Sequence, residues 1–230
     1  MRNRLFTLGC AFALVLAVGA PARAGEVLDQ IVATVNGHVI LQSDWEDAMR
    51  YEAFIAGRHP GEITGTDRKA ALDRLIDQEL LREQIHASDF QRATDEEVAK
   101  RIQEVRKQYS DAGGDEGWHS LLARYGLTEA GLKERVALQS DLMRLVDARL
   151  RPNVNIDGKT IESYYNQELI PQLRQSGAKD VPLADVSGKI KELLTEQKVN
   201  QLLVAWLQNL RSGSEIRTAP QSADSGTQVR

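Results

Sequence analysis

The feature that most constrains the fold is an Asn-Gly pair, Asn36-Gly37, between two short apolar runs. The runs cover residues 31–35 and 38–41. Asn-Gly favours the tight turn of a β-hairpin, because both residues tolerate positive φ. Two strands are only marginally stable by themselves, so the hairpin needs a further partner. We expect residues 214–218, near the other end of the chain, to form a strand beside residues 31–35.

Between these strands the apolar residues recur at the spacing of amphipathic helices. Helices are predicted over about residues 43–57, 66–86, 94–109, 118–125, 128–150, 157–169 and 183–211. The residues predicted to cap helices are Ser43, Thr94, Thr128 and Asp157. Pro152 is expected to end one helix, and Pro171 is expected to kink or end another. The predicted fold class is therefore mainly α, with many helices and a small sheet that joins the two ends of the chain.

The two ends of the chain are predicted to lie outside the folded part. Residues 1–24 are typical of a secretory signal peptide, with basic Arg2 and Arg4 before the apolar stretch 6–18. Small residues follow, and cleavage is predicted after Ala24. Residues 219–230 are rich in Ser, Gln and Gly and are predicted to be a disordered tail.

Composition excludes several classes of function. Hydrophobic residues make up 42% of the chain and charged residues 27%, which is typical of a globular protein. The first 24 residues hold three arginines and no acidic residue, so the net charge of −4 becomes −7 without them. An acidic body argues against nucleic-acid binding, which needs clustered Lys and Arg. Cys10 is the only cysteine, which excludes disulfides within the chain and cysteine catalysis.

No residue pattern points to a cofactor or a metal. The histidines do not have the spacing of a helical zinc site; they are His38, His59, His86 and His119. No serine stands in a nucleophile-elbow motif, and no glycine loop is suited to phosphate. We therefore expect no catalytic, cofactor-binding or metal-binding residues.

The apolar stripes are the remaining candidates for a binding site. A body of few helices has more apolar surface than it can bury, and exposed apolar patches mark interaction sites. The candidate contacts for a polypeptide client are Leu138, Met143, Val146, Tyr164, Tyr165 and Trp206. A place in the core is the alternative for each of them.

Four segments, taken in order, carry a resemblance to a known family. They are residues 31–40 followed by Ser43-Asp44, residues 71–81, residues 121–128 and residues 183–217. Together they resemble the SurA-like periplasmic chaperones over most of residues 27–217. The resemblance implies one chaperone domain over residues 25–218, closed by a helix at 183–211 and a strand at 214–218.

That resemblance also implies a function. It indicates a periplasmic holdase-type chaperone that binds unfolded outer-membrane or other exported polypeptides through an apolar groove. It implies no stable membrane insertion after signal cleavage. Members of the family normally hold parvulin prolyl isomerase domains before the closing helix, whereas only residues 174–182 lie there in this chain. A parvulin domain cannot fit in that stretch, so no isomerase activity is expected.

Two alternatives stay open at this stage. Residues 113–118, Gly-Gly-Asp-Glu-Gly-Trp, are similar to a parvulin signature and would fit a peptidyl-prolyl isomerase-related protein. We interpret them as a glycine-rich turn between helices, because a motif counts only in its structural context. The other alternative is a periplasmic interaction scaffold that binds one fixed partner and is not a chaperone.

Overall fold

The computed structural model describes residues 29–87, 91–109 and 112–219. The predicted signal peptide and the predicted tail beyond residue 219 lie outside these ranges. The strands are β1 (Ile31–Val35), β2 (His38–Leu41) and β3 (Ile216–Thr218). The longer helices are α1 (Gln42–Ile55), α2 (Gly65–His86), α3 (Asp95–Lys107), α4 (Gly114–Arg124), α5 (Glu129–Leu150) and α8 (Leu183–Ser212). The short helical segments are η1 (Pro60–Glu62), η3 (Arg151–Asn153), α6 (Gly158–Tyr164), the π-helical turn η4 (Tyr165–Leu169) and α7 (Ile170–Gln175).

The three strands form one antiparallel sheet in the order β2-β1-β3, which confirms both the hairpin and its third strand. Asn36 and Gly37 have φ angles of 50° and 86°, as the tight turn requires. The Asn36 side chain also braces the turn. Its Nδ2 donates to both carboxylate oxygens of Glu83 on α2 (3.1 and 2.8 Å), and its Oδ1 accepts from the N–H of Glu215 (2.9 Å). The turn thereby joins the hairpin, α2 and the segment before β3.

Three of the predicted caps are confirmed. Thr94, Thr128 and Asp157 accept hydrogen bonds from the first turns of α3, α5 and α6. The prediction that Ser43 caps the first helix is wrong. The Ser43 hydroxyl donates to the carboxylate of Asp29, and the helix already begins at Gln42. Asp44 accepts from the N–H of Leu41 instead (3.0 Å).

Pro171 does not end the helical segment in which it lies. The π-helical turn η4 precedes it, and the helix then continues as α7. Proline has no N–H for an intrahelical bond, and the π-helical turn before Pro171 is the local irregularity at which the helix accommodates this loss. Pro152, as predicted, follows the end of α5 directly and lies in the short helical turn η3.

Three apolar clusters stabilise the main body of the molecule. The first joins α1, α3, α4 and α5 around Phe54 and Trp118, which are 0% and 1% exposed. The second packs the sheet against α1 and α2 around Val35 and Leu80. The third is smaller and lies where α8 crosses α2 and α5.

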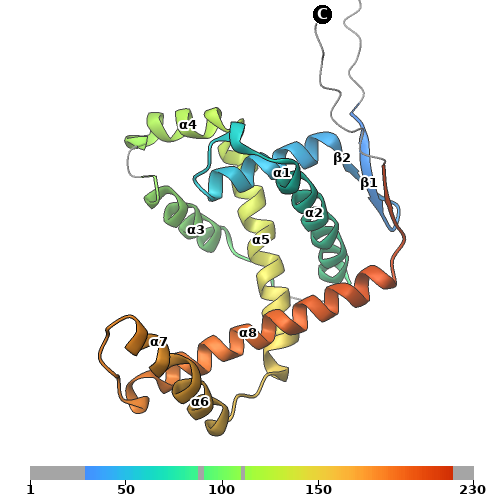
Figure 1. Cartoon of the computed structure of the whole chain (residues 1–230). Coiled ribbons are helices and arrows are strands. Elements are labelled where there is room, and N and C mark those ends of the chain that lie inside the picture. The colour runs from blue at the N-terminus through green and yellow to red at the C-terminus, as the bar shows by residue number, and fades with distance from the viewer. Residues whose placement is uncertain (1–28, 88–90, 110–111, 220–230) are drawn as a thin grey trace, which may run out of the picture.

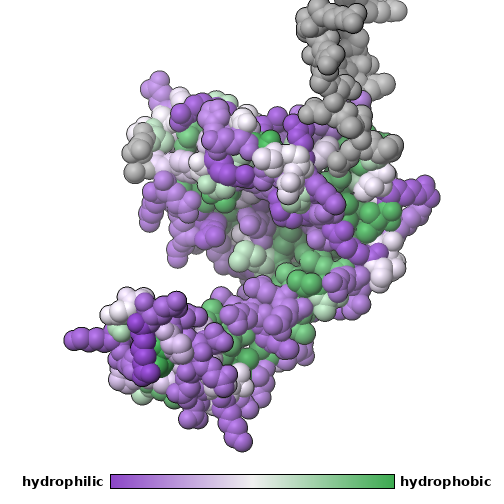
Figure 2. All heavy atoms as spheres, in the orientation of Figure 1, coloured by the Kyte–Doolittle hydropathy of each residue, from purple (hydrophilic) through white to green (hydrophobic). Residues whose placement is uncertain are grey.

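Helix α8 connects the body with a separate lobe (Figure 1). At one end it leads into β3, and Arg211 fixes it to α2 by donating to Asp77 Oδ1 (2.5 Å) and to the carbonyl of Asp73 (2.8 Å). At the other end it packs against α6, and we call α6, η4 and α7 the lobe. Figure 2 shows a hollow between body and lobe, with hydrophobic side chains gathered at its inner end near the crossing of α5 and α8. No helix within the described ranges is both long and apolar enough to span a membrane.

Candidate functional site

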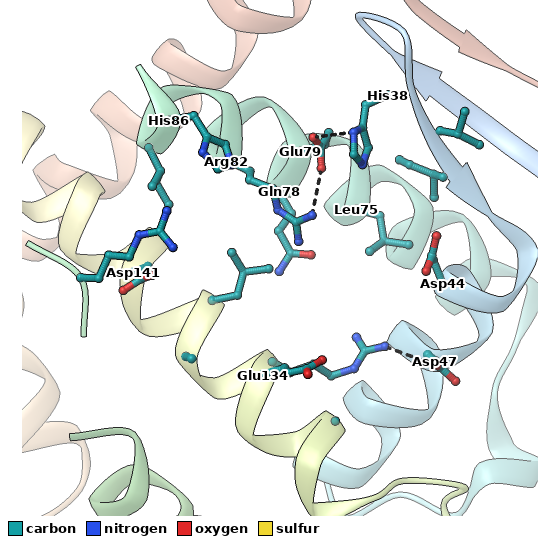
Figure 3. Close-up of a pocket in the computed structure, with 18 residues that line it drawn as sticks. His38, Asp44, Asp47, Leu75, Gln78, Glu79, Arg82, His86, Glu134 and Asp141 are labelled. Carbon is teal, nitrogen blue, oxygen red and sulfur yellow. Dashed lines mark ion pairs between the residues drawn. The ribbon is translucent and has the colours of Figure 1, made fainter. Parts of the chain in front are cut away.

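A cavity lies between the hairpin, α1, α2 and α5 (Figure 3). Its volume is about 760 Å³. The apolar residues that line it are Val39, Ile40, Leu75, Ile85, Ala137 and Leu138. The charged and polar residues are His38, Asp44, Asp47, Gln78, Glu79, Arg82, His86, Arg92, Glu134, Arg135 and Asp141. The cavity therefore offers apolar surface between charges of both signs.

Glu79 on α2 is the most distinctive residue of this cavity. It is 8% exposed and is the only charged residue buried in the described part of the chain. Its carboxylate lies 3.6 Å from Nδ1 of His38 on β2 and 3.6 Å from Nη1 of Arg82 on its own helix. Burying a carboxylate costs several kcal/mol unless cations or hydrogen bonds compensate it. Arg82 supplies a cation beside the carboxylate, and the contact with His38 joins the hairpin to α2.

A second set of charged contacts defines the opposite wall. Arg135 on α5 lies 3.8 Å from Asp47 on α1, which also pairs with Arg50. The guanidinium of Arg135 lies over the ring of Tyr51, 5.6 Å from its centroid. Burial raises the pKa of the Tyr51 hydroxyl, which donates to Gln139 Oε1 (3.0 Å). These contacts hold α1 and α5 at a fixed separation, so the cavity is bounded on three sides by braced elements.

The sequence-predicted client contacts do not gather in this cavity. Leu138 is half-buried and lines it, whereas Met143 and Val146 lie farther along α5. Met143 is 59% exposed, the most exposed of the large hydrophobic residues in the described ranges. Tyr164 contributes to a separate hollow of about 430 Å³ between α6, η4 and α8.

Two of the candidates serve as structural contacts. The hydroxyl of Tyr165 donates to the carbonyl of Val181 (2.8 Å) and so fastens the lobe to the segment before α8. Trp206 packs on the third cluster, and the guanidinium of Arg149 lies 4.6 Å from its ring centroid. Both side chains are half-buried. The structure therefore distributes the six residues over the cavity, the crossing of α5 and α8, and the lobe.

Sequence reasoning missed His38, Glu79, Arg82 and Arg135 as site residues. A signal for Glu79 does exist. It lies three residues after the buried Ile76 and seven after the buried Leu72, so it continues the apolar stripe of α2. A charged residue in a buried stripe needs a partner from another element, and that partner is found only once the chain has folded.

The glycine-rich motif at 113–118 forms the start of a helix. Gly113 and Gly114 have positive φ angles, and α4 begins at Gly114. Trp118 is 1% exposed in the first cluster, and Asp115 pairs with Arg106 at 2.8 Å. The motif thus marks a turn between helices, as its sequence context indicates. In the described ranges, no three His, Cys, Asp or Glu side chains are placed to hold a metal ion.

Comparison with known proteins places the chain in a family. A family model described as the SurA-like N-terminal domain matches residues 4–145, which is more than half of the chain. The chain belongs to the SurA-like N-terminal domain family. Every residue that lines the cavity lies within this match.

A curated relative extends the SurA-like similarity to nearly the whole chain. Chaperone SurA of Chromohalobacter salexigens is 25% identical over 234 residues, which cover 95% of this chain and 51% of that protein. The chain thus spans about half the length of the curated relative that it matches. Between α7 and α8 it holds only residues 176–182, so no parvulin domain is inserted at that point.

Proposed function

We propose that this protein is a chaperone that binds non-native polypeptides in the periplasm and holds them without chemical catalysis. The clients would be unfolded outer-membrane or other exported proteins. Membership of the SurA-like family and the name of the relative, Chaperone SurA, support this role. We propose further that residues 25–218 form the mature chaperone domain, after removal of residues 1–24 as a signal peptide.

The cavity is the observation that carries the proposal. A volume of about 760 Å³ is large enough for several residues of an extended chain. Its apolar side chains offer contact area to a client, and its charges of both signs offer hydrogen bonds without demanding one sequence. Leu138 stands among the apolar residues of the lining and belongs to none of the three clusters.

Aggregation of an unfolded β-barrel protein tests the proposal. The mature protein should delay light scattering when the client is diluted from urea, because a bound chain cannot aggregate. The variant Leu138→Glu places a carboxylate in the cavity and should weaken this protection. Ala148→Glu introduces the same carboxylate at an exposed position of α5 outside the cavity and should leave protection intact.

Two results would overturn the proposal. One is a mature protein that leaves the scattering curves of several unrelated unfolded clients unchanged. The other is measurable proline isomerisation that is lost on changing Asp115 or Trp118, which would favour the isomerase alternative. Binding to one folded partner and to no unfolded client would favour the scaffold alternative.

A further inference from the structure

Strand β2 lies at an edge of the sheet, and hydrogen bonds show which of its backbone groups point outward. The order β2-β1-β3 leaves one side of β2 unpaired. On the other side of β1, Asn36 N donates to the carbonyl of Glu215 and Ala219 N donates to the carbonyl of Val32, both at 2.9 Å. The even-numbered residues of β1 and its turn therefore face β3.

Alternation along an antiparallel ladder settles the direction of the β2 backbone. Ala33 and Val35 of β1 face β2, and their register partners are Ile40 and His38; a bulge between Ile31 and Ala33 shifts the register beyond this point. Val39 lies opposite Thr34, which faces β3. The N–H and C=O of Val39 consequently point away from β1, out of the free edge of the sheet.

This edge opens into the cavity. His38, Val39 and Ile40 are all lining residues of the cavity. The next outward N–H along the strand, that of Leu41, is bound by the carboxylate of Asp44. The free edge is thus one residue wide, and it offers one donor and one acceptor beside the apolar lining.

We propose that an extended segment of the client adds to β2 as a further strand and exchanges hydrogen bonds with Val39. This inference rests on the proposed function and specifies what the cavity recognises: the main chain of a non-native polypeptide. Every residue except proline carries the same donor and acceptor, so such a contact accepts many sequences. Side chains of the added strand alternate between two faces, so only every second one meets the apolar lining.

The shortness of the edge fits this role. A long exposed edge strand is a template for pairing between copies of a protein and so promotes aggregation. An edge with a single free residue offers too few hydrogen bonds for two copies of the protein to pair edge to edge. It can still orient a client chain that is held mainly by apolar contacts. The mixed lining of the cavity supplies those further contacts.

Substitution of Val39 by proline tests the inference. Proline lacks the N–H but is tolerated on an edge strand where that group faces away from the sheet. Binding of a fluorescein-labelled ten-residue peptide, taken from a strand of the β-barrel client, is followed by anisotropy. We expect Val39→Pro to bind it about three- to tenfold more weakly, as loss of one hydrogen bond predicts.

Thr218→Pro is the matched control. Thr218 pairs with Ala33, which faces β2, so the Thr218 N–H also points out of the sheet, but at the opposite edge. Thr218 does not line the cavity. This variant should bind the peptide like the wild type.

A second arm leaves the protein unchanged and alters the peptide. In an added strand, alternate backbone N–H groups of the peptide face β2 and the others face away. One peptide is N-methylated at its odd-numbered residues and another at its even-numbered residues, so each peptide loses one of these two sets of N–H donors. Strand addition predicts that the two peptides differ in affinity, because only one set faces β2. This arm decides the question if Val39→Pro lowers the melting temperature strongly.

The results separate this inference from the proposed function. Equal binding by wild type and folded Val39→Pro, or equal loss for both methylated peptides, overturns strand addition while the chaperone role stands. A wild-type protein that binds neither the peptide nor an unfolded client overturns both.

Discussion

The main body and the lobe are stabilised in different ways. The body encloses three apolar clusters, in which Trp118 and Phe54 are at most 1% exposed. In the lobe, Ile170 is the only buried residue of α6, η4 and α7. Polar contacts hold the rest: Tyr165 donates to the Val181 carbonyl, and Arg174 pairs with Asp180 at 2.6 Å.

This difference indicates which part of the molecule opens or shifts more easily. Stability that comes from buried apolar area is cooperative and resists local opening, whereas exposed hydrogen bonds and ion pairs each contribute little. A segment with few buried contacts opens at a lower free energy than the core. We therefore expect the cavity to keep its shape and the lobe to open more easily.

The largest effect is expected from Phe54→Ala. Phe54 is fully buried, stacks on Tyr109 with ring centroids 5.0 Å apart, and meets Trp118 and Tyr125 edge to face. Its loss should lower the free energy of unfolding by about 3–5 kcal/mol in urea denaturation. Ile55→Ala, at the next position and 39% exposed, is the control and should cost less than about 1 kcal/mol. Equal losses in the free energy of unfolding for the two variants would contradict the conclusion that buried apolar side chains stabilise the body.

A smaller and local effect is expected from Ile170→Ala. The lobe loses its only buried helical side chain, which should cost about 2–3 kcal/mol if the lobe unfolds together with the body. If the lobe is an independent unit, the global transition will stay nearly unchanged while protease cuts appear between residues 151 and 182. Limited proteolysis beside urea denaturation distinguishes the two results. If the lobe and the body lose stability in the same transition, they fold as one cooperative unit.

The smallest expected effect is a loss of stability at low pH when Asp67 is protonated. Hydrogen bonds from the backbone and hydroxyl of Thr64, at the start of α2, lower the pKa of Asp67 from 3.8 to about 2. The folded state therefore binds this proton less readily than the unfolded state, so the stabilisation is complete above about pH 5 and is lost as the pH falls from 4 to 2. The melting temperatures of wild type and Asp67→Asn should differ at pH 6 and converge towards pH 2. Glu62→Gln, at an exposed position, should show no such convergence.

Features set by near neighbours in the chain could be predicted from the sequence. The hairpin follows from two residues that tolerate positive φ, and the caps at Thr94, Thr128 and Asp157 act within three residues. The Ser43 prediction failed because a distant group intervened. The carboxylate of Asp29, fourteen residues earlier, accepts from the Ser43 hydroxyl and removes it from the helix end.

The candidate site could be predicted only in part, because it depends on contacts between distant elements. Leu138 was found from its apolar stripe, but the contact between His38 and Glu79 joins residues 41 positions apart. Charged residues on helices usually face solvent, so nothing in the local pattern marks Arg135 as part of a wall. The placing of Met143, Tyr164 and Trp206 outside the cavity likewise depends on how α5, the lobe and α8 cross.

The connection between α7 and α8 has a consequence for how proteins of this type can change. Residues 176–182 run along the outer tip of the lobe, far from the sheet that fastens the first and last strands (Figure 1). A domain inserted at this loop would extend outward from the lobe. It would not disturb the packing of the three apolar clusters. Gene insertion at this loop can thus alter the number of attached modules while the cavity stays as it is.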